Sequence, residues 1–152
     1  LLNIKINIFS YELSDKSPIY FVAKEIIIGK KWEEESLFDH IEEVIRTKEI
    51  HILVPFVDQA TVVLSKLKMQ IQEKYPNVLF AVSELFQTEI FFDKLLANKW
   101  CLLNKINVPP QFVNEFPLIA KPKGGSASKG IIVVENNEQL MKIDQSEFIL
   151  VK

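Results

Sequence analysis

Three of the chain's four glycines lie between two short apolar runs, residues 118–120 and 131–134, which have the length and β-branched content of strands. Glycine lets the backbone adopt positive φ and turn its N–H groups inward, and serine hydroxyls add further donors. With several lysines nearby, a loop of this composition could fold over a polyphosphate. The residues concerned are Lys121, Lys123, Gly124, Gly125, Ser126, Ser128, Lys129 and Gly130.

A loop of this composition can also be a mobile hairpin connection without a ligand, and by itself the loop favours that interpretation. It is not a Walker A loop, because Lys129 is followed by Gly130 and a strand instead of by a Ser or Thr that opens a helix. It is not a dinucleotide fingerprint either, since no strand-to-helix turn of a βαβ unit follows it.

An amphipathic helix is predicted just before this loop. Asp93 and Lys94 open it, and the segment ends at Val108-Pro109, where proline prevents continuation. Apolar residues recur at three- and four-residue spacing, which is typical of a helix with one buried face. These apolar residues are Leu95, Leu96, Trp100, Leu102, Leu103 and Ile106.

In its order of elements, this segment resembles the start of the ATP-grasp domain. In that family an Asp-Lys pair begins a helix, and a later strand ends in Lys-Pro and leads into a glycine-rich phosphate loop. The matching residues here are Asp93-Lys94, Lys121-Pro122 and the loop 124–130. The chain departs from the family at Lys105, where Gly is usual, and at Ala97 and Ala127, where Thr and Gly are often found.

The resemblance implies an ATP site with Mg²⁺ in the complete protein. Lys94 would contact the α- or β-phosphate side, and Lys121 would reach the phosphates from the end of the strand. The residues that would form the lid over the phosphates are Gly124, Gly125, Ser126, Ala127 and Ser128. No residue of the chain is assigned a catalytic or metal-binding role.

The first half of the chain alternates between predicted strands and helices. Strands are expected at 4–9, 25–28, 50–55 and 78–82, and helices at 33–48, from a capping Asp58 to about residue 75, and from Ser83. Repetition of strand and helix predicts a parallel, doubly wound α/β layer. This half resembles the small Rossmann-like domain that precedes the ATP-grasp domain in carbamoyl phosphate synthase large subunits. We therefore expect domains at 1–90 and 91–152.

Both ends are expected to be truncated relative to that family. The chain starts with Leu1, and its first strand matches the family's second, so a gap is predicted between the strands at 4–9 and 50–55. At the other end, 147–152 resembles the strand that leads to the adenine-binding hinge. The family's Mg²⁺ ligands and late basic residue would follow it, so the chain alone is predicted to be inactive and to bind nucleotide weakly.

Composition narrows the remaining classes. The net charge is −2 and the basic residues are scattered, which argues against nucleic acid as a partner. No apolar run approaches the ~18 residues of a membrane span. A single cysteine, Cys101, is compatible with a cytoplasmic location. His40 and His51 are poor evidence for zinc. Five aromatic residues are expected in the core, namely Phe80, Phe86, Phe91, Phe92 and Trp100.

Two interpretations of function follow. In the first, the chain is part of an ATP-dependent carboxylate–amine ligase or a carbamoyl phosphate synthase-like enzyme, whose partners are ATP, a small carboxylate or bicarbonate and an amine. In the second, it is a non-catalytic module that binds a nucleotide or small ligand, or that assembles homo-oligomers. The sequence does not identify the acid or the amine.

Overall fold

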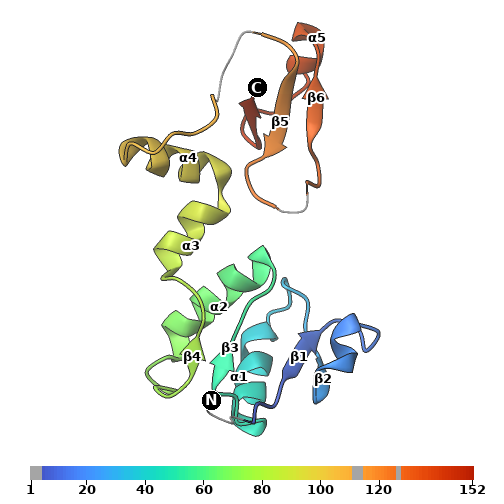
Figure 1. Ribbon diagram of the computed structural model, residues 1–152, viewed down its shortest axis with the longest axis vertical. Coiled ribbons are helices and arrows are strands. Elements are labelled where there is room, and N and C mark those ends of the chain that lie inside the picture. The colour runs from blue at the N-terminus through green and yellow to red at the C-terminus, as the bar shows by residue number, and fades with distance from the viewer. Residues whose placement is uncertain (1–4, 111–114, 126–127) are drawn as a thin grey trace. The chain divides into compact units, whose positions relative to one another are not determined.

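The computed structural model describes residues 5–110, 115–125 and 128–152. Contacts between residues divide the chain into two units, Leu1–Ile52 and Leu53–Lys152, which we describe separately. Short strands alternate with helices in the earlier part of the chain, and an antiparallel sheet follows in the later part (Figure 1). The mixed α/β class predicted from the sequence is confirmed.

The first unit is built on two parallel strands and a helix. Phe9 pairs with Glu25 and Glu12 with Ile28, so the two strands run in the same direction. A 3-10 helix forms part of the crossover that parallel strands require. The elements are β1 (Phe9–Glu12), the 3-10 helix η1 (Pro18–Phe21), β2 (Glu25–Ile28) and α1 (Leu37–Thr47).

Strand β1 lies later in the sequence than predicted. Residues 5–8 are not in a strand, and the alternating Ile6 and Ile8 are exposed. Ile4 lies outside the described residues. The period-two pattern indicated an extended chain, but a strand also needs a hydrogen-bonding partner, and β2 pairs only with the residues of β1. The prediction of a strand is therefore wrong at residues 5–8 and confirmed at Phe9.

Helix α1 buries one face, along which apolar residues recur at helical spacing. Leu37, Ile41 and Ile45 recur every four residues and are all buried. The helix begins later than the predicted residue 33. The backbone N–H of Lys31 donates to the Glu34 carboxylate at 2.8 Å, and the chain turns here before the helix starts.

The middle of the chain forms a second two-stranded sheet and three helices. β3 and β4 pair with each other and, among the described strands, not with β1 or β2. Asp58 is the first residue of α2 and makes no capping bond, so its predicted cap role is wrong. The elements are β3 (Ile52–Leu53), α2 (Asp58–Ile71), β4 (Leu79–Phe80), α3 (Leu85–Phe92) and α4 (Lys94–Leu103).

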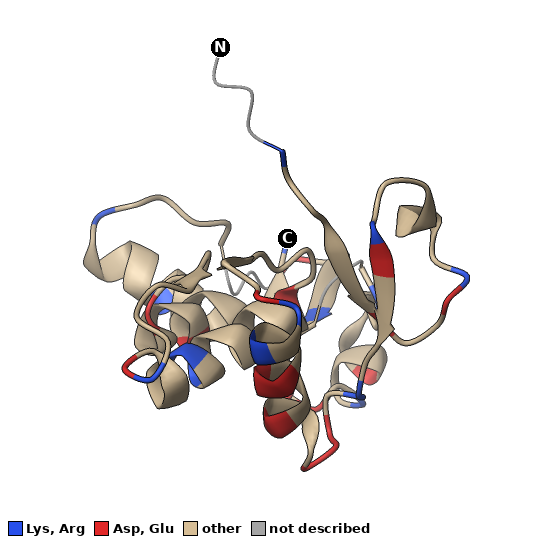
Figure 2. Ribbon diagram, turned by 90° about the horizontal axis from the view of Figure 1, so that it is seen from below, with Lys and Arg blue, Asp and Glu red and all other residues tan. Residues whose placement is uncertain are grey.

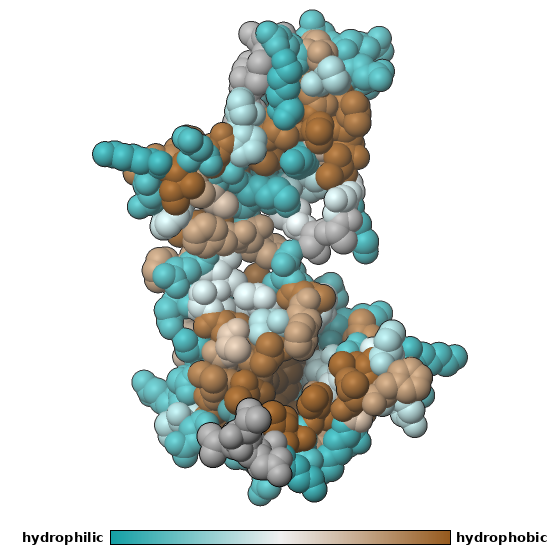
Figure 3. Space-filling view, viewed as in Figure 1, coloured by the Kyte–Doolittle hydropathy of each residue, from teal (hydrophilic) through white to brown (hydrophobic). Residues whose placement is uncertain are grey.

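The last part of the chain is a three-stranded antiparallel sheet with β5 in the centre. Its core consists of Leu118, Ala120, Val134 and Leu150, which are almost fully buried. Apolar side chains also remain on the surface of this part (Figure 3), including Val133, which is 57% exposed. The elements are β5 (Leu118–Pro122), β6 (Ile132–Val134), the short helix α5 (Asn137–Leu140) and β7 (Phe148–Val151).

The end of α4 places Lys105 in a backbone conformation that favours glycine. Lys105, where the ATP-grasp family usually has glycine, has a positive φ of 60°. The N–H of Lys105 donates to the carbonyl of Leu102 at 3.1 Å, and that of Ile106 donates to Cys101 at 2.8 Å. These two bonds are the Schellman motif, which places the residue after the cap in the left-handed region that glycine adopts most easily. Lysine is therefore strained at this position.

Replacing Lys105 with glycine should stabilise the protein by about 1 kcal/mol, because the left-handed conformation costs a non-glycine residue about that much. The midpoint of urea unfolding should rise accordingly. Lys99→Gly, in the interior of the same helix, is the matched control and should lower stability by about 1 kcal/mol. A decrease in stability for both variants would contradict the strain inferred at Lys105.

Basic and acidic residues are interspersed along the helices and loops in the view of Figure 2. Two i,i+4 ion pairs, Lys30 with Glu34 and Lys142 with Glu138, are exposed and contribute little to stability. Among the described helices, none is long and apolar enough to cross a lipid bilayer.

Candidate functional site

Helix α4 begins where the sequence predicted, and Asp93 is its N-cap. The Asp93 carboxylate accepts hydrogen bonds from the backbone N–H groups of Leu95 at 2.7 Å and Leu96 at 3.0 Å. These donors have no partners within the helix, so an Asp at this position both satisfies them and complements the helix dipole. The cap fixes where the helix begins and therefore the position of Lys94, its first residue.

Lys94 lies against the start of the glycine loop. Its backbone N–H donates to the carbonyl of Lys123 at 2.8 Å. The Lys94 Nζ lies 3.0 Å from the carbonyl oxygen of Gly125 and 3.4 Å from that of Gly124. The structure therefore brings together two segments that the sequence analysis assigned to one site, although about thirty residues separate them along the chain.

Lys121 lies on the central strand of the sheet. Its neighbour Ala120 is completely buried in the core, and successive side chains of a strand point to opposite faces, so Lys121 belongs to the other face. The Lys121 side chain is partly buried. Within the part of the chain that the structure describes, no carboxylate or carbonyl pairs with its ammonium group. A half-buried, unpaired lysine is suited to an anionic ligand.

The described part of the glycine loop has the backbone conformation that its composition predicted. Gly125, Ser128 and Gly130 all have positive φ, at 91°, 57° and 75°. A side chain at Gly130 would also approach Pro122 Cγ to 3.1 Å. Residues with positive φ in a loop can turn backbone N–H groups into a concavity that binds anions. Ser126 and Ala127, two of the predicted lid residues, lie outside the described residues.

Lys123 has a structural role that sequence analysis did not predict. Its ammonium donates to the carbonyl of Ser146, and its N–H donates to the carbonyl of Glu147 at 2.9 Å. Nearby, hydrogen bonds from the hydroxyl and the N–H of Ser146 lower the pKa of the Asp144 carboxyl, and the charge of Lys123 adds to this effect. Lys123 thus ties the end of β5 to the turn that precedes β7.

Aromatic residues around α3 and α4 differ from the prediction that all five are core. Phe80 is buried, and the ring of Phe92 lies 3.5 Å from where a Cβ of Gly124 would stand. Phe86, Phe91 and Trp100 are exposed, and the last two form an edge-to-face pair with ring centroids 5.1 Å apart. The prediction is wrong for these three residues. Phe86 and Phe91 lie on α3, whose apolar residues are spread around the helix so that not all of them can be buried, and Trp100 lies on α4 beside Phe91.

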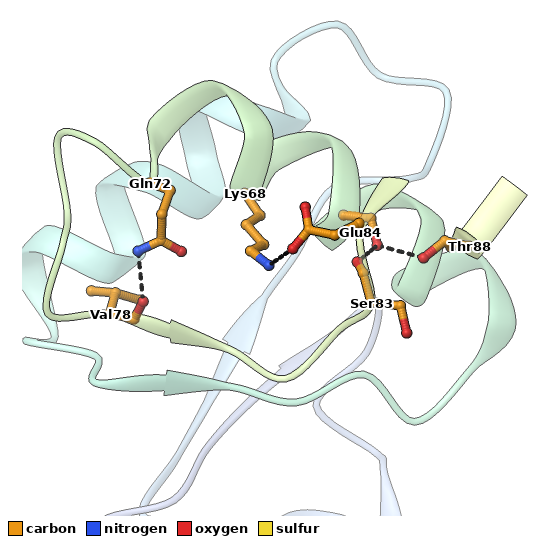
Figure 4. A network of polar contacts seen from close by, with 7 residues as sticks. Lys68, Gln72, Val78, Ser83, Glu84 and Thr88 are labelled. Carbon is orange, nitrogen blue, oxygen red and sulfur yellow. Dashed lines mark hydrogen bonds and ion pairs between the residues drawn. The ribbon is translucent and has the colours of Figure 1, made fainter. Parts of the chain in front are cut away.

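A polar network missed by the sequence analysis anchors α3 to α2 (Figure 4). The hydroxyl groups of Ser65 and Thr88, both buried, lie 2.9 Å apart, and Ser65 also donates to the carbonyl of Ser83 at 3.2 Å. At the edge of this network Lys68 pairs with Glu84 at 2.6 Å. The sequence signal for this network is Ser65, a polar residue within the apolar face of α2. The network holds the helix that leads directly into Asp93 and Lys94.

In residues 5–110, 115–125 and 128–152, no group of three or more His, Cys, Asp or Glu side chains is arranged to hold a metal ion. His40 instead shares a hydrogen bond of 2.8 Å between its Nδ1 and the Tyr11 hydroxyl, with the donor set by the tautomer of the imidazole. The Tyr11 hydroxyl also accepts a hydrogen bond from the Lys30 N–H at 3.1 Å.

A comparison with protein-family models finds no match, and neither does a comparison with curated protein sequences. Solved structures do match. N5-carboxyaminoimidazole ribonucleotide synthetase from Thermotoga maritima superimposes with a TM-score of 0.62 at 19% identity, over 96% of this chain and 39% of its own. D-alanine–D-alanine ligase from Bacillus anthracis superimposes with a TM-score of 0.60 at 14% identity, over 96% and 56%.

A third match is the biotin carboxylase domain of 2-oxoglutarate carboxylase from Hydrogenobacter thermophilus, in complex with MgADP, ADP and bicarbonate. Its TM-score is 0.67 at 14% identity, over 95% of this chain and 38% of its own. These proteins are ATP-grasp enzymes, and the chain has their fold. The chain spans between about two fifths and just over half of the length of these three proteins.

Proposed function

We propose that the chain carries part of the ATP phosphate site of an ATP-dependent carboxylate–amine ligase, or of a carbamoyl phosphate synthase-like enzyme. The observation that carries the proposal is the contact between Lys94 and the start of the glycine loop. It brings the start of the capped helix to the loop that follows the Lys121 strand, which supports a single phosphate site formed by all three. MgADP and bicarbonate in the Hydrogenobacter biotin carboxylase domain support the same class of ligand.

Residues of the chain fit a polyphosphate for three reasons. Lys121 is partly buried and has no anionic partner among the described residues, so a phosphate would supply the missing charge. Gly125, Ser128 and Gly130 have the backbone conformation from which N–H groups can converge on an anion. The Lys94 ammonium lies where the loop begins. Ser126 and Ala127 are proposed to complete the loop.

In this proposal the residues bind and orient the phosphate chain. ATP would supply the phosphoryl group that converts a carboxylate or bicarbonate to an acyl phosphate, which an amine then attacks. Phosphoryl transfer depends mainly on positioning and charge neutralisation, and Lys94, Lys121 and the loop N–H groups can provide both. We assign no Mg²⁺ ligand to this chain and expect Mg²⁺ to arrive with ATP.

The domain assignment is part of the proposal. We infer a Rossmann-like domain over 1–90 and the first lobe of the ATP-grasp domain over 91–152. Asp93 supports a boundary close to residue 90, because it ends α3 and caps α4 at the same time. A cytoplasmic location and association into homo-oligomers are likewise proposed, and sedimentation would measure the association.

Lys121→Ala should abolish the stabilisation of the protein by millimolar Mg-ATP in a thermal shift measurement. Loss of a charge-assisted contact of about 1.5 to 3 kcal/mol weakens binding roughly tenfold to a hundredfold. Lys66→Ala, which removes an exposed lysine of α2, is the matched control and should keep the wild-type response. An equal response of both variants would contradict a phosphate contact at Lys121. A wild-type chain that does not respond would favour the non-catalytic alternatives.

A further inference from the structure

The ammonium group of Lys94 is surrounded by three consecutive backbone carbonyl groups. Its Nζ lies 3.5 Å from the carbonyl oxygen of Lys123, 3.4 Å from that of Gly124 and 3.0 Å from that of Gly125. We call residues 123–125 the loop base. An ammonium has three donors and no acceptor, so these three oxygens match its whole donor capacity. A phosphate cannot be fully bound by Lys94 while the loop base holds it.

Contacts on the loop base are unequal. On the inner side, the Lys94 N–H holds the carbonyl of Lys123 at 2.8 Å, and Phe92 lies against Gly124. Gly125 has a φ of 91°, and a Cβ built on it would meet no atom of the described residues within 4 Å. Of the three carbonyl oxygens, that of Gly125 is nearest to the Lys94 ammonium, and Gly125 is less closely packed than Gly124. We therefore expect the Lys94 side chain to help hold the Gly125 carbonyl in place.

We propose that Lys94 exchanges partners in the phosphate site: it holds the loop base when no nucleotide is bound, and phosphate oxygens replace the carbonyl oxygens on binding. The inference rests on the proposed function, because that function supplies the second set of partners. A charged phosphate oxygen forms a stronger hydrogen bond to an ammonium than a neutral carbonyl does, so the exchange is favourable. Its consequence is that nucleotide binding releases the loop base from α4.

The holding contact can be tested without nucleotide by amide hydrogen exchange at residue 94 and at Lys123. Lys94→Met keeps the length of the side chain but removes its donors. Exchange at these two amides, corrected for the intrinsic rate of each residue, should become about tenfold faster. Lys99→Met, on the same helix with no partner among the described residues, should change it less than about twofold. Unchanged exchange in Lys94→Met would overturn the holding contact.

The exchange of partners can be tested by nuclear magnetic resonance on the wild-type protein. A scalar coupling across the hydrogen bond from Lys94 Nζ to the carbonyl carbon of Gly125 should be present without nucleotide and disappear at saturating Mg-ATP. A coupling that persists at saturation would overturn the exchange. If Mg-ATP does not bind at all, the proposed function fails and the exchange fails with it, whereas the holding contact is decided by the nucleotide-free experiment alone.

Discussion

Replacing Gly29 with alanine should destabilise the protein by about 3 kcal/mol. An added Cβ would stand 2.2 Å from Cε1 and 2.5 Å from Cδ1 of the Tyr11 ring, far inside van der Waals contact. The ring cannot simply swing away. The Tyr11 hydroxyl forms a hydrogen bond of 2.8 Å with His40 Nδ1 and accepts another from the Lys30 N–H at 3.1 Å, so moving the ring breaks both bonds. Urea unfolding measures the loss.

Protonation of Tyr11 keeps this anchor in place across the neutral range. Burial raises the pKa of the Tyr11 hydroxyl, the hydrogen bond from the Lys30 N–H opposes this, and the negative charge of Glu34 raises it further. The hydroxyl therefore keeps its proton, and the ring stays uncharged, at neutral pH and above it.

A double-mutant cycle isolates the clash between Gly29 and Tyr11. Tyr11→Ala removes the ring, so Gly29→Ala made in that background should cost less than about 0.5 kcal/mol. The coupling energy would then account for most of the effect of the single substitution. A loss of equal size in both backgrounds would show that Gly29 is needed for a reason other than the ring.

Leu118→Ala should also cost about 3 kcal/mol, because it removes a fully buried side chain from the core of the β6–β5–β7 sheet. Leu118 is 1% exposed and pairs with Val134 in the neighbouring strand. The surrounding strands are held by their backbone hydrogen bonds, so the cavity cannot collapse fully. Unfolding in urea, with hydrogen exchange of the β5 and β7 amides, measures the effect and localises it.

The matched control for this prediction is Leu103→Ala at the end of α4. Leu103 is 84% exposed, so the same chemical change should alter stability by less than about 0.5 kcal/mol. Similar losses at Leu118 and Leu103 would contradict the assignment of the core to the face of β5 that carries Leu118.

Local chemistry in the sequence predicted much of the candidate site. Asp93 caps α4 because a short carboxylate just before a helix reaches the free N–H groups of the first turn. The strand that carries Lys121 and the loop conformation at Gly125 followed from β-branched and glycine residues. The apolar face of α1 followed from four-residue spacing. All of these features depend on residues close together in the chain.

Other features depended on partners distant in the sequence, and the predictions failed there. Whether Ile6 and Ile8 join a strand is decided by the length of β2, and the surface position of Phe91 and Trp100 is decided by what packs on α3. The contact of the Lys94 ammonium with the carbonyl groups of Lys123 and Gly125 also depends on residues that are distant in the sequence.

By itself the sequence determined that Asp93 caps α4, that glycine permits positive φ in the loop and that Lys121 lies at a strand, since these are properties of neighbouring residues. Only the tertiary structure decided that the Lys94 ammonium meets the start of the loop and that Lys123 is bound to the turn before β7. The physical reason is that a lysine side chain has several rotatable bonds and no preferred partner. Its contacts are set by whichever oxygens the packed helices and strands bring within its reach.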